Sequence, residues 1–277
     1  TGRDVAVRRA FAQQGRACAR LGSPFMARLM ALCAARLAPR GAVAEAVLSW
    51  PGDPGPAAES PALRLAGGLH GLVISGADPA LVAVYPPAAA SDEALWAAVE
   101  GALARHPGRL MEALSRAPQT NEVRRAAALI PALALVARAT GRPLALWELG
   151  CAAGLNLRCD RFALEAGEAR FGPSGAAVRL APDWQGSVPE PVALEVVGRR
   201  GVDLAPRDPG AAGDRLRLLS YLWPDQPERR ALTEAALDLA RAVPAEIVQA
   251  DAAAWLQGAL GRRRAGVTTV LVHTVAW

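Results

Sequence analysis

Lysine is missing from this sequence. Its 277 residues include 31 basic side chains, and every one of them is arginine. The absence excludes several classes of enzyme, because a P-loop needs a lysine on the phosphates, and pyridoxal-phosphate enzymes and Schiff-base aldolases need a lysine amine. The arginines are scattered except for the run at residues 262–264, so the charge pattern does not indicate a groove for nucleic acid.

Cysteine, histidine and long apolar runs are also scarce. The four cysteines form no Cys-x-x-Cys pair and are too few for a disulfide framework, so we expect a reducing, cytoplasmic setting. The longest uncharged apolar run, residues 126–137, is too short to span a bilayer and predicts a buried helix rather than a membrane segment. The three histidines, at positions 70, 106 and 273, have no carboxylates or thiols at ligand spacing, so no metal site is expected.

The pattern of the chain changes at residue 142. Residues 1–142 are predicted to be almost wholly helical, apart from a proline- and glycine-rich loop at 50–61, with Ser23, Ser91 and Thr120 as helix N-caps. Residues 143–277 alternate short apolar strands with helices, which indicates a parallel sheet with right-handed crossovers. The predicted fold is α/β: a Rossmann-like parallel-sheet domain preceded by an all-helical N-terminal region. Strands are expected at 144–150, 191–198, 246–251 and 266–277, and a hairpin at 161–172.

The stretch LWELGCAAGLNL predicts a buried strand that leads into a tight turn of small residues and then a helix. Its small and acidic positions are Glu148, Gly150, Ala152 and Gly154. Corners of this kind usually hold a nucleotide-like ligand. A dinucleotide fingerprint, Gly-x-Gly-x-x-Gly, would place glycine at 152 and at 155, where this chain has alanine and leucine. A dinucleotide therefore fits the turn poorly.

The pattern Glu-x-Gly-x-Ala-x-Gly resembles the first motif of class I S-adenosylmethionine-dependent methyltransferases. This chain departs from the motif at Ala152, where the family usually has glycine. The resemblance implies that S-adenosylmethionine binds at Glu148, Gly150, Ala152 and Gly154. Tight packing of the strand against the helix is the alternative explanation for the small residues.

The same resemblance implies an acid near the end of the second strand, for the ribose hydroxyls, and a polar residue after the third, beside the adenine. Asp203 is the candidate for the first position and Asp251 for the second. Helix capping is the alternative for both residues, and Asp251 stands directly before a predicted helix. For Asp203 the sequence favours neither interpretation.

A second resemblance covers nearly the whole chain. It is to the bacterial family filed as domain of unknown function 2332, and it implies a helical N-terminal half, a Rossmann-like C-terminal half and no assigned activity. The segments that carry it, in chain order, are GSPFMARLM, LRLAGGLHGLVISG, QTNEVRRAAALIP, LWELGCAAGLNLRCDRF, RRGVDLAP, YLWPDQPERRALTEAA and VLVHTVAW.

A polar cluster precedes one of the predicted helices. Gln119, Asn121 and Glu122 crowd around the helix start, and we expect them to face the glycine turn and receive a substrate. Asn156 and Asp160, just past the turn, would face the same cleft. The alternative is that the cluster only caps the helix.

His273 lies near the end of the last predicted strand. In open parallel sheets, ligands bind beyond the carboxyl ends of the strands. Histidine is the side chain that ordinarily titrates near neutral pH, so His273 is the candidate catalytic base, with Glu122 as a second candidate catalytic residue. The alternative is a buried histidine whose nitrogens are satisfied by its neighbours.

The leading hypothesis is a methyltransferase that uses S-adenosylmethionine and acts on a small acceptor. A non-catalytic Rossmann-like ligand-binding or interaction module is the main alternative, and Ala152 favours it. A nicotinamide or flavin oxidoreductase is a further alternative that the glycine spacing disfavours. The methyltransferase resemblance implies more strands than this chain supplies, so we expect it to be truncated after Trp277.

Overall fold

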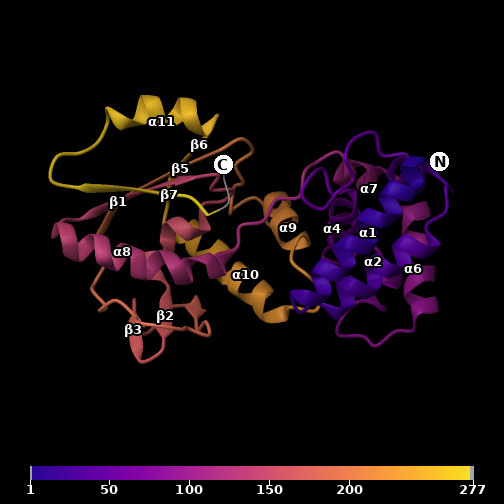
Figure 1. Cartoon of the computed structure of the whole chain (residues 1–277), viewed down its shortest axis with the longest axis horizontal. Helices are drawn as coiled ribbons and strands as arrows, with labels where there is room; N and C mark the ends of the chain where they lie inside the picture. Colours follow the sequence, from indigo (N-terminus) through magenta and orange to yellow (C-terminus); the bar gives the residue numbers. More distant parts are fainter. Residues whose placement is uncertain (1, 275–277) are drawn as a thin grey trace. The chain divides into compact units, whose positions relative to one another are not determined.

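The computed structural model of the chain describes residues 2–274, which form two compact units (Figure 1). The helical unit consists of residues 1–120 with 216–230, and the sheet unit of residues 121–215 with 231–277. The observed division thus falls before residue 121 rather than after residue 142. It assigns the long helix in front of the sheet to the sheet unit.

Helix starts in the helical unit follow the local sequence. Ser23 Oγ accepts the N–H of Met26 at 3.2 Å, with Pro24 in the first turn, and Ser91 Oγ accepts the N–H of Ala94 at 3.2 Å, so both predicted caps are confirmed. The helices of this unit are α1 (Gly2–Arg20), α2 (Pro24–Arg36), α3 (Ala42–Leu48), α4 (Pro61–Ile74), α5 (Pro79–Val82), α6 (Asp92–Arg105) and α7 (Pro107–Leu114).

The sheet unit opens with a short 3-10 helix, η1 (Val123–Arg125), which leads into α8 (Ala126–Thr140). The prediction of Thr120 as the cap is wrong, because the N-cap is Glu122, whose carboxylate accepts the N–H of Arg124 at 3.2 Å. Helix α8 contains the apolar run noted in the sequence. Within residues 2–274, no helix is both long and apolar enough to cross a membrane.

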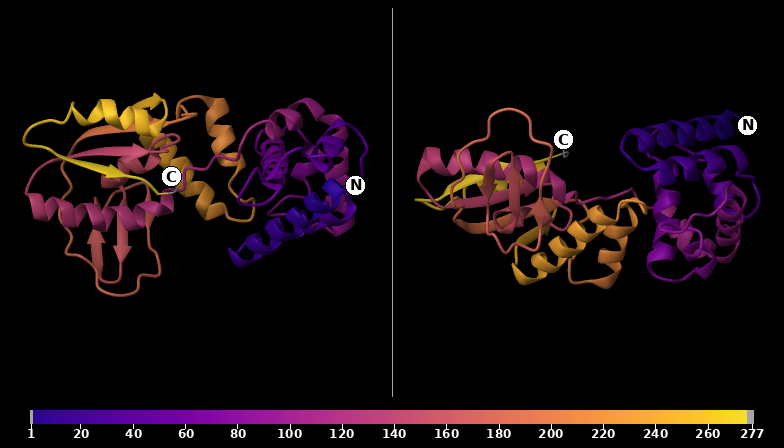
Figure 2. Two further views of the ribbon diagram at one scale, coloured as in Figure 1. Left: turned by 45° about the horizontal axis from the view of Figure 1, so that its top comes forward. Right: turned by 90° about the horizontal axis from the view of Figure 1, so that it is seen from below.

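A four-stranded parallel sheet forms the centre of the sheet unit. Its spatial order is β6-β5-β1-β7, so the chain runs outward from β1 to β5 and β6 and then returns to the other side of β1. Helix α11 (Ala252–Leu260) covers one face and α8 the other (Figures 1 and 2). This order confirms the Rossmann-like α/β fold. The strands are β1 (Leu144–Leu149), β5 (Val196–Asp203), β6 (Glu246–Gln249) and β7 (Thr268–Val272).

The connection from β1 to β5 departs from a simple strand–helix–strand unit. The helix expected after the turn is a 3-10 helix, η2, and it is followed by the predicted hairpin, in which β2 and β3 pair antiparallel. We call residues 162–195 the hairpin segment. The connection contains η2 (Leu155–Arg161), β2 (Ala163–Ala166), β3 (Ala169–Phe171) and β4 (Arg179–Leu180), and β5 is joined to β6 by α9 (Ala212–Ser220) and α10 (Pro227–Ala242).

Strand β5 begins later than the sequence predicts. A strand was expected at 191–198, whereas β5 contains the two arginines that follow. Contacts distant in sequence stabilise them: Arg199 Nη2 pairs with Asp160 at 2.5 Å, and the guanidinium of Arg200 lies 5.5 Å from the centroids of two tryptophan rings. As a consequence, Asp203 is the last residue of β5 rather than part of the loop beyond it.

Strand β7 confirms the last predicted strand within 266–277, although it is shorter than expected. Residues 275–277 lie outside the described part of the chain. The expectation of further strands after Trp277 stays a prediction.

Candidate functional site

The turn that follows β1, residues 150–155, has an unusual backbone. Gly150, Ala152 and Gly154 have φ angles of 65°, 51° and 64°, in the left-handed region that favours glycine. A methyl group on Gly154 would also come within 2.9 Å of Arg158 Nη1 and of Ile247 Cδ1. Position 154 therefore needs glycine both for its conformation and for its packing.

The first half of the turn is bonded to the end of β5. Gly150 and Cys151 donate their N–H groups to the carbonyl of Val202 at 2.8 and 3.2 Å. Ala152 donates its N–H to Asp203 Oδ2 at 2.8 Å. The two neighbouring strands thus hold the turn at their carboxyl ends, where a sheet with this strand order binds ligands.

The second half of the turn is bonded to Asn121. The Oδ1 atom of this buried side chain accepts the N–H groups of Ala153 and Leu155, each at 3.1 Å. Gly154 donates to the carbonyl of Cys151 at 2.6 Å. All of the N–H groups of residues 150–155 therefore donate to atoms of the protein itself.

Asp203 lies at the position where the methyltransferase resemblance implies an acid for the ribose. Its Oδ2 accepts from Ala152, and its Oδ1 accepts the N–H of Ala205 at 2.8 Å. The residue is half-buried, and each oxygen of an ionised carboxylate can accept more than one hydrogen bond. The contacts of Asp203 with the turn are thus compatible with further hydrogen bonds from a ligand.

Glu148 lies at the carboxyl end of β1 with only 2% of its surface exposed. Burial raises the pKa of this carboxyl group to about 8, while the side-chain hydrogen bond with Asn156 and the charges of Arg158 and Arg125 oppose the rise. Within residues 2–274, neither Glu148 Oε2 nor Asn156 Oδ1 has a hydrogen-bond partner. The Nδ2 of Asn156 donates to the carbonyl of Glu122 at 3.3 Å. Two buried acceptor atoms therefore lie beside the turn.

The end of β7 reaches the same neighbourhood through Thr274. In the sheet, Glu148 is paired with Val272, and Arg125 Nη1 donates to Thr274 Oγ1 at 2.9 Å. His273, between these two residues, is exposed at the carboxyl end of β7 rather than buried under a helix. Its assignment as a catalytic base stays a prediction.

Arg158 is a buried structural residue that the sequence pattern does not predict. It is 2% exposed, and burial lowers its pKa to about 10. Its guanidinium donates to the carbonyls of Gly154 at 2.6 Å and Val243 at 2.9 Å, with longer bonds to Ala153 and Ala240 at 3.4 and 3.3 Å. The side chain thus connects the turn to the C-terminal end of α10. The position of this arginine inside the apolar stretch AAGLNLRC is the one sequence feature that indicates a buried, bonded side chain.

Glu122, from the predicted polar cluster, has a local role. Glu122 caps η1 and pairs with Arg124 Nε at 3.0 Å, and its side chain is 13% exposed. Gln119 belongs to the helical unit, whereas Asn121 and Asn156 belong to the sheet unit with the turn.

Two of the aspartates considered for the site form their contacts away from the turn. Asp251 Oδ1 accepts the N–H groups of Ala253 and Ala254, each at 3.0 Å, so it caps α11 as the alternative interpretation proposed. The expectation that Asp160 faces the same cleft as Asn156 is wrong. Its side chain pairs with Arg199 and lines a pocket at the amino end of β5.

Cys151 and His70 fill structural roles. Cys151 is fully buried, burial raises the pKa of its thiol, and a Cβ on Gly201 would come within 2.5 Å of its Sγ, so it is a packing residue. His70 Nδ1 donates to the carbonyl of Ser220 at 3.2 Å, and burial lowers its pKa to about 4. Within residues 2–274, no group of three or more His, Cys, Asp or Glu side chains is arranged to hold a metal ion.

The family model described as "Uncharacterized protein conserved in bacteria (DUF2332)" matches residues 8–277. The chain belongs to this family. No curated protein and no solved structure has significant similarity to the DUF2332 chain. The bacterial family resemblance is thereby confirmed, whereas the methyltransferase resemblance depends on the turn and the strand order alone.

A pocket of about 630 Å³ in the DUF2332 chain lies beside Arg158 and Ile247, and its lining contains none of residues 150–155. Arg158 and Ile247, which both approach Gly154, line it together with residues 206–210 after β5 and the end of α10. This volume lies in the range of small-molecule sites, ~300–1,000 Å³.

Proposed function

We propose that the DUF2332 chain binds S-adenosylmethionine at the turn and transfers its methyl group to a small acceptor. The observation that carries this proposal is the distribution of hydrogen-bond donors and acceptors at the turn. The backbone N–H groups of residues 150–155 all donate to the protein, whereas acceptor atoms of Glu148, Asn156 and Asp203 lie beside the turn. S-adenosylmethionine carries an ammonium group and two ribose hydroxyls, which match these acceptor atoms, and a sulfonium, which matches the negative charge of Asp203. It has no phosphate that would need backbone donors.

Each group has a role in this proposal. Asp203 would accept hydrogen bonds from the ribose hydroxyls, and Glu148 with Asn156 would orient the ammonium group. Gly150, which is exposed and has no side chain, would let the ligand approach the backbone of the turn. The pocket lined by Arg158 and Ile247, which both approach Gly154, would give the adenosyl portion a volume of suitable size.

Methyl transfer makes small demands on the protein. S-adenosylmethionine supplies the methyl group, and the protein must align the acceptor with it and accept one proton. His273, exposed at the carboxyl end of β7, is the proposed base, and Glu122 is the second candidate. The acceptor is proposed to be small.

The lack of unbonded N–H groups in residues 150–155 disfavours a nicotinamide or flavin oxidoreductase. A pyrophosphate binds the free N–H groups of a glycine-rich turn and helix N-terminus. In this turn those groups are bonded to Asn121, Asp203, Val202 and Cys151.

A second candidate function is a non-catalytic binding module. The observation that favours it is Ala152, which places a methyl group and a left-handed conformation where the methyltransferase motif has glycine. This candidate uses the same fold and retains ligand binding without transfer.

Calorimetric titration of the intact chain tests the proposal. S-adenosylmethionine and S-adenosylhomocysteine should bind, and NAD should not. Asp203→Asn should weaken both affinities at least tenfold, because it removes the negative charge and one acceptor. Asp251→Asn is the matched control and should have no effect, since asparagine caps a helix as well as aspartate. Binding of NAD without either sulfur ligand, or full affinity in Asp203→Asn, would refute the proposed site.

A further inference from the structure

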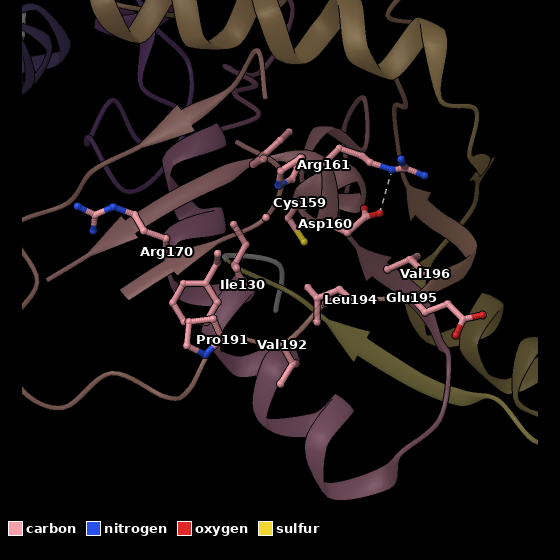
Figure 3. Close-up of a pocket in the computed structure, with 15 residues that line it drawn as sticks. Ile130, Cys159, Asp160, Arg161, Arg170, Pro191, Val192, Leu194, Glu195 and Val196 are labelled. Atoms are coloured by element: carbon pink, nitrogen blue, oxygen red, sulfur yellow. Dashed lines mark ion pairs between the residues drawn. The ribbon is translucent and has the colours of Figure 1, made fainter. Parts of the chain in front are cut away.

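A separate pocket of about 590 Å³ lies at the amino end of β5. Val196, the first residue of β5, lines it, whereas Asp203 and the turn lie at the opposite end of that strand. Figure 3 shows the charged ends of Arg170 and Glu195 directed away from the centre of the pocket. The lining combines polar and apolar surface, and its apolar part includes Ile130, Phe162, Phe171, Val192, Leu194 and Val196.

The hairpin segment builds one wall of this pocket and is firmly packed. Gly172 has a φ of 74°, and a Cβ at this position would come within 1.9 Å of the carbonyl oxygen of Phe162. Ala163 donates its N–H to the carbonyl of Val178 at 2.9 Å. The chain therefore crosses itself closely at Phe162 and Gly172, which both line the pocket.

A buried carboxylate stands at one edge of the pocket. The side chain of Asp160 is 3% exposed, and its Oδ2 is held by Arg199 Nη2 at 2.5 Å and by Arg161 Nε at 3.2 Å (Figure 3 shows the pair with Arg161). Its Oδ1 is buried and has no hydrogen-bond partner within residues 2–274. An unsatisfied buried acceptor is costly, and a donor supplied by a ligand would satisfy it.

Several charged side chains around the pocket form ion pairs within the protein. Asp160 is paired with Arg199, and Arg170 Nη2 lies 3.5 Å from Glu165. Arg161 and Arg199 both pair with the one carboxylate of Asp160, and an uncharged ligand would leave these ion pairs in place. An uncharged ligand with an apolar body and one hydrogen-bond donor matches both the lining and the unsatisfied oxygen.

We propose that this pocket binds a small uncharged alcohol or phenol. Its ring or chain would lie among Ile130, Val192 and Leu194, and its O–H would donate to Asp160 Oδ1. The proposal is independent of the methyl donor, because the pocket's lining contains no residue of the turn.

Phenol and anisole are matched probes for this site, because anisole has the same ring without the O–H donor. Titration of the intact chain should show phenol binding about tenfold more tightly than anisole, the effect expected of one hydrogen bond to a charged acceptor. Equal affinities, or no binding of either compound at millimolar concentration, would overturn the proposal.

Two sets of variants locate the binding. Val192→Trp should fill the pocket and abolish phenol binding. Val197→Trp should leave binding unchanged, because Val197 is 39% exposed and outside the lining. The double variant Asp160→Leu with Arg199→Met removes the buried pair without leaving one charge unpaired, and it should abolish the preference for phenol over anisole. Undiminished phenol binding in Val192→Trp would contradict the assignment, and so would a retained preference in the double variant.

Discussion

The side-chain oxygen of Asn121 accepts two backbone N–H groups of the turn, from Ala153 and Leu155, each at 3.1 Å. One residue in front of α8 therefore fixes the conformation of a turn more than 30 positions later in the chain. The same contact occupies donors that a phosphate would need. The turn therefore offers a phosphate no backbone donor that is not already bonded to the protein.

Asn121→Ala should destabilise the protein by about 2 kcal/mol, because it leaves two N–H groups of the turn without acceptors. Asn121→Asp is the matched control and should retain most of the stability, since a carboxylate oxygen accepts the same two bonds. Chemical denaturation of both variants measures the difference. Equal stability of the alanine and aspartate variants would show that these bonds do not hold the turn.

Ala152→Gly should leave the stability unchanged or raise it by up to about 1 kcal/mol. Glycine relieves the left-handed strain at this position, and the added freedom of the unfolded chain offsets part of the gain. Ala153→Gly, at the neighbouring buried alanine, should cost about 1 kcal/mol, because that residue has no positive φ to relieve. Thermal unfolding of the two variants measures their stabilities. A similar loss of stability in both variants would contradict strain at Ala152.

Glu148→Gln should change how stability depends on pH. The pKa of Glu148 rises from 4.5 to about 8 on folding, so below pH 4.5 the carboxyl is protonated in both states. Between these values the folded state keeps a proton that the unfolded state releases, and stability falls as pH rises through this window. The variant does not titrate, so it should gain on the order of 4 kcal/mol relative to the parent chain between pH 5 and pH 9. Urea midpoints at the two pH values measure this gain, and a constant difference would refute the shift.

Arg158→Met should destabilise the protein by about 3 kcal/mol, because it leaves the carbonyls of Gly154 and Val243 without their buried donor. Arg158→Lys should be intermediate, since one ammonium group cannot span both carbonyls. Arg161→Met is the control: that side chain is 57% exposed, and its loss should cost less than about 1 kcal/mol. Comparable losses at the two arginines would contradict the role of Arg158.

The sequence predicts the parts of the fold that local pattern determines. Strand β1, the hairpin and the caps at Ser23 and Ser91 follow from apolar runs, turn residues and hydroxyl side chains. The start of β5 does not, because its arginines depend on Asp160 and on tryptophan rings distant in sequence. Pattern alone therefore places this strand too early.

The candidate site shows the same limit. The small residues of the turn are visible in the sequence, but its partners Asn121, Asp203 and Arg158 come from three separate segments. Their contacts also explain why a 3-10 helix, rather than the expected α-helix, follows the turn. Side-chain bonds from elsewhere in the chain hold its first residues, and Arg158 itself departs from helical geometry with a φ of −107°.

A crystal structure of the intact chain with S-adenosylhomocysteine is the most direct test of the central claim. The account predicts the ligand at the carboxyl ends of β1 and β5, with ribose oxygens within hydrogen-bond distance of the Asp203 carboxylate and the amino group beside Glu148 and Asn156. The turn should keep its hydrogen bonds to Asn121. A ligand bound elsewhere at saturating concentration, or a turn left empty, would contradict the account.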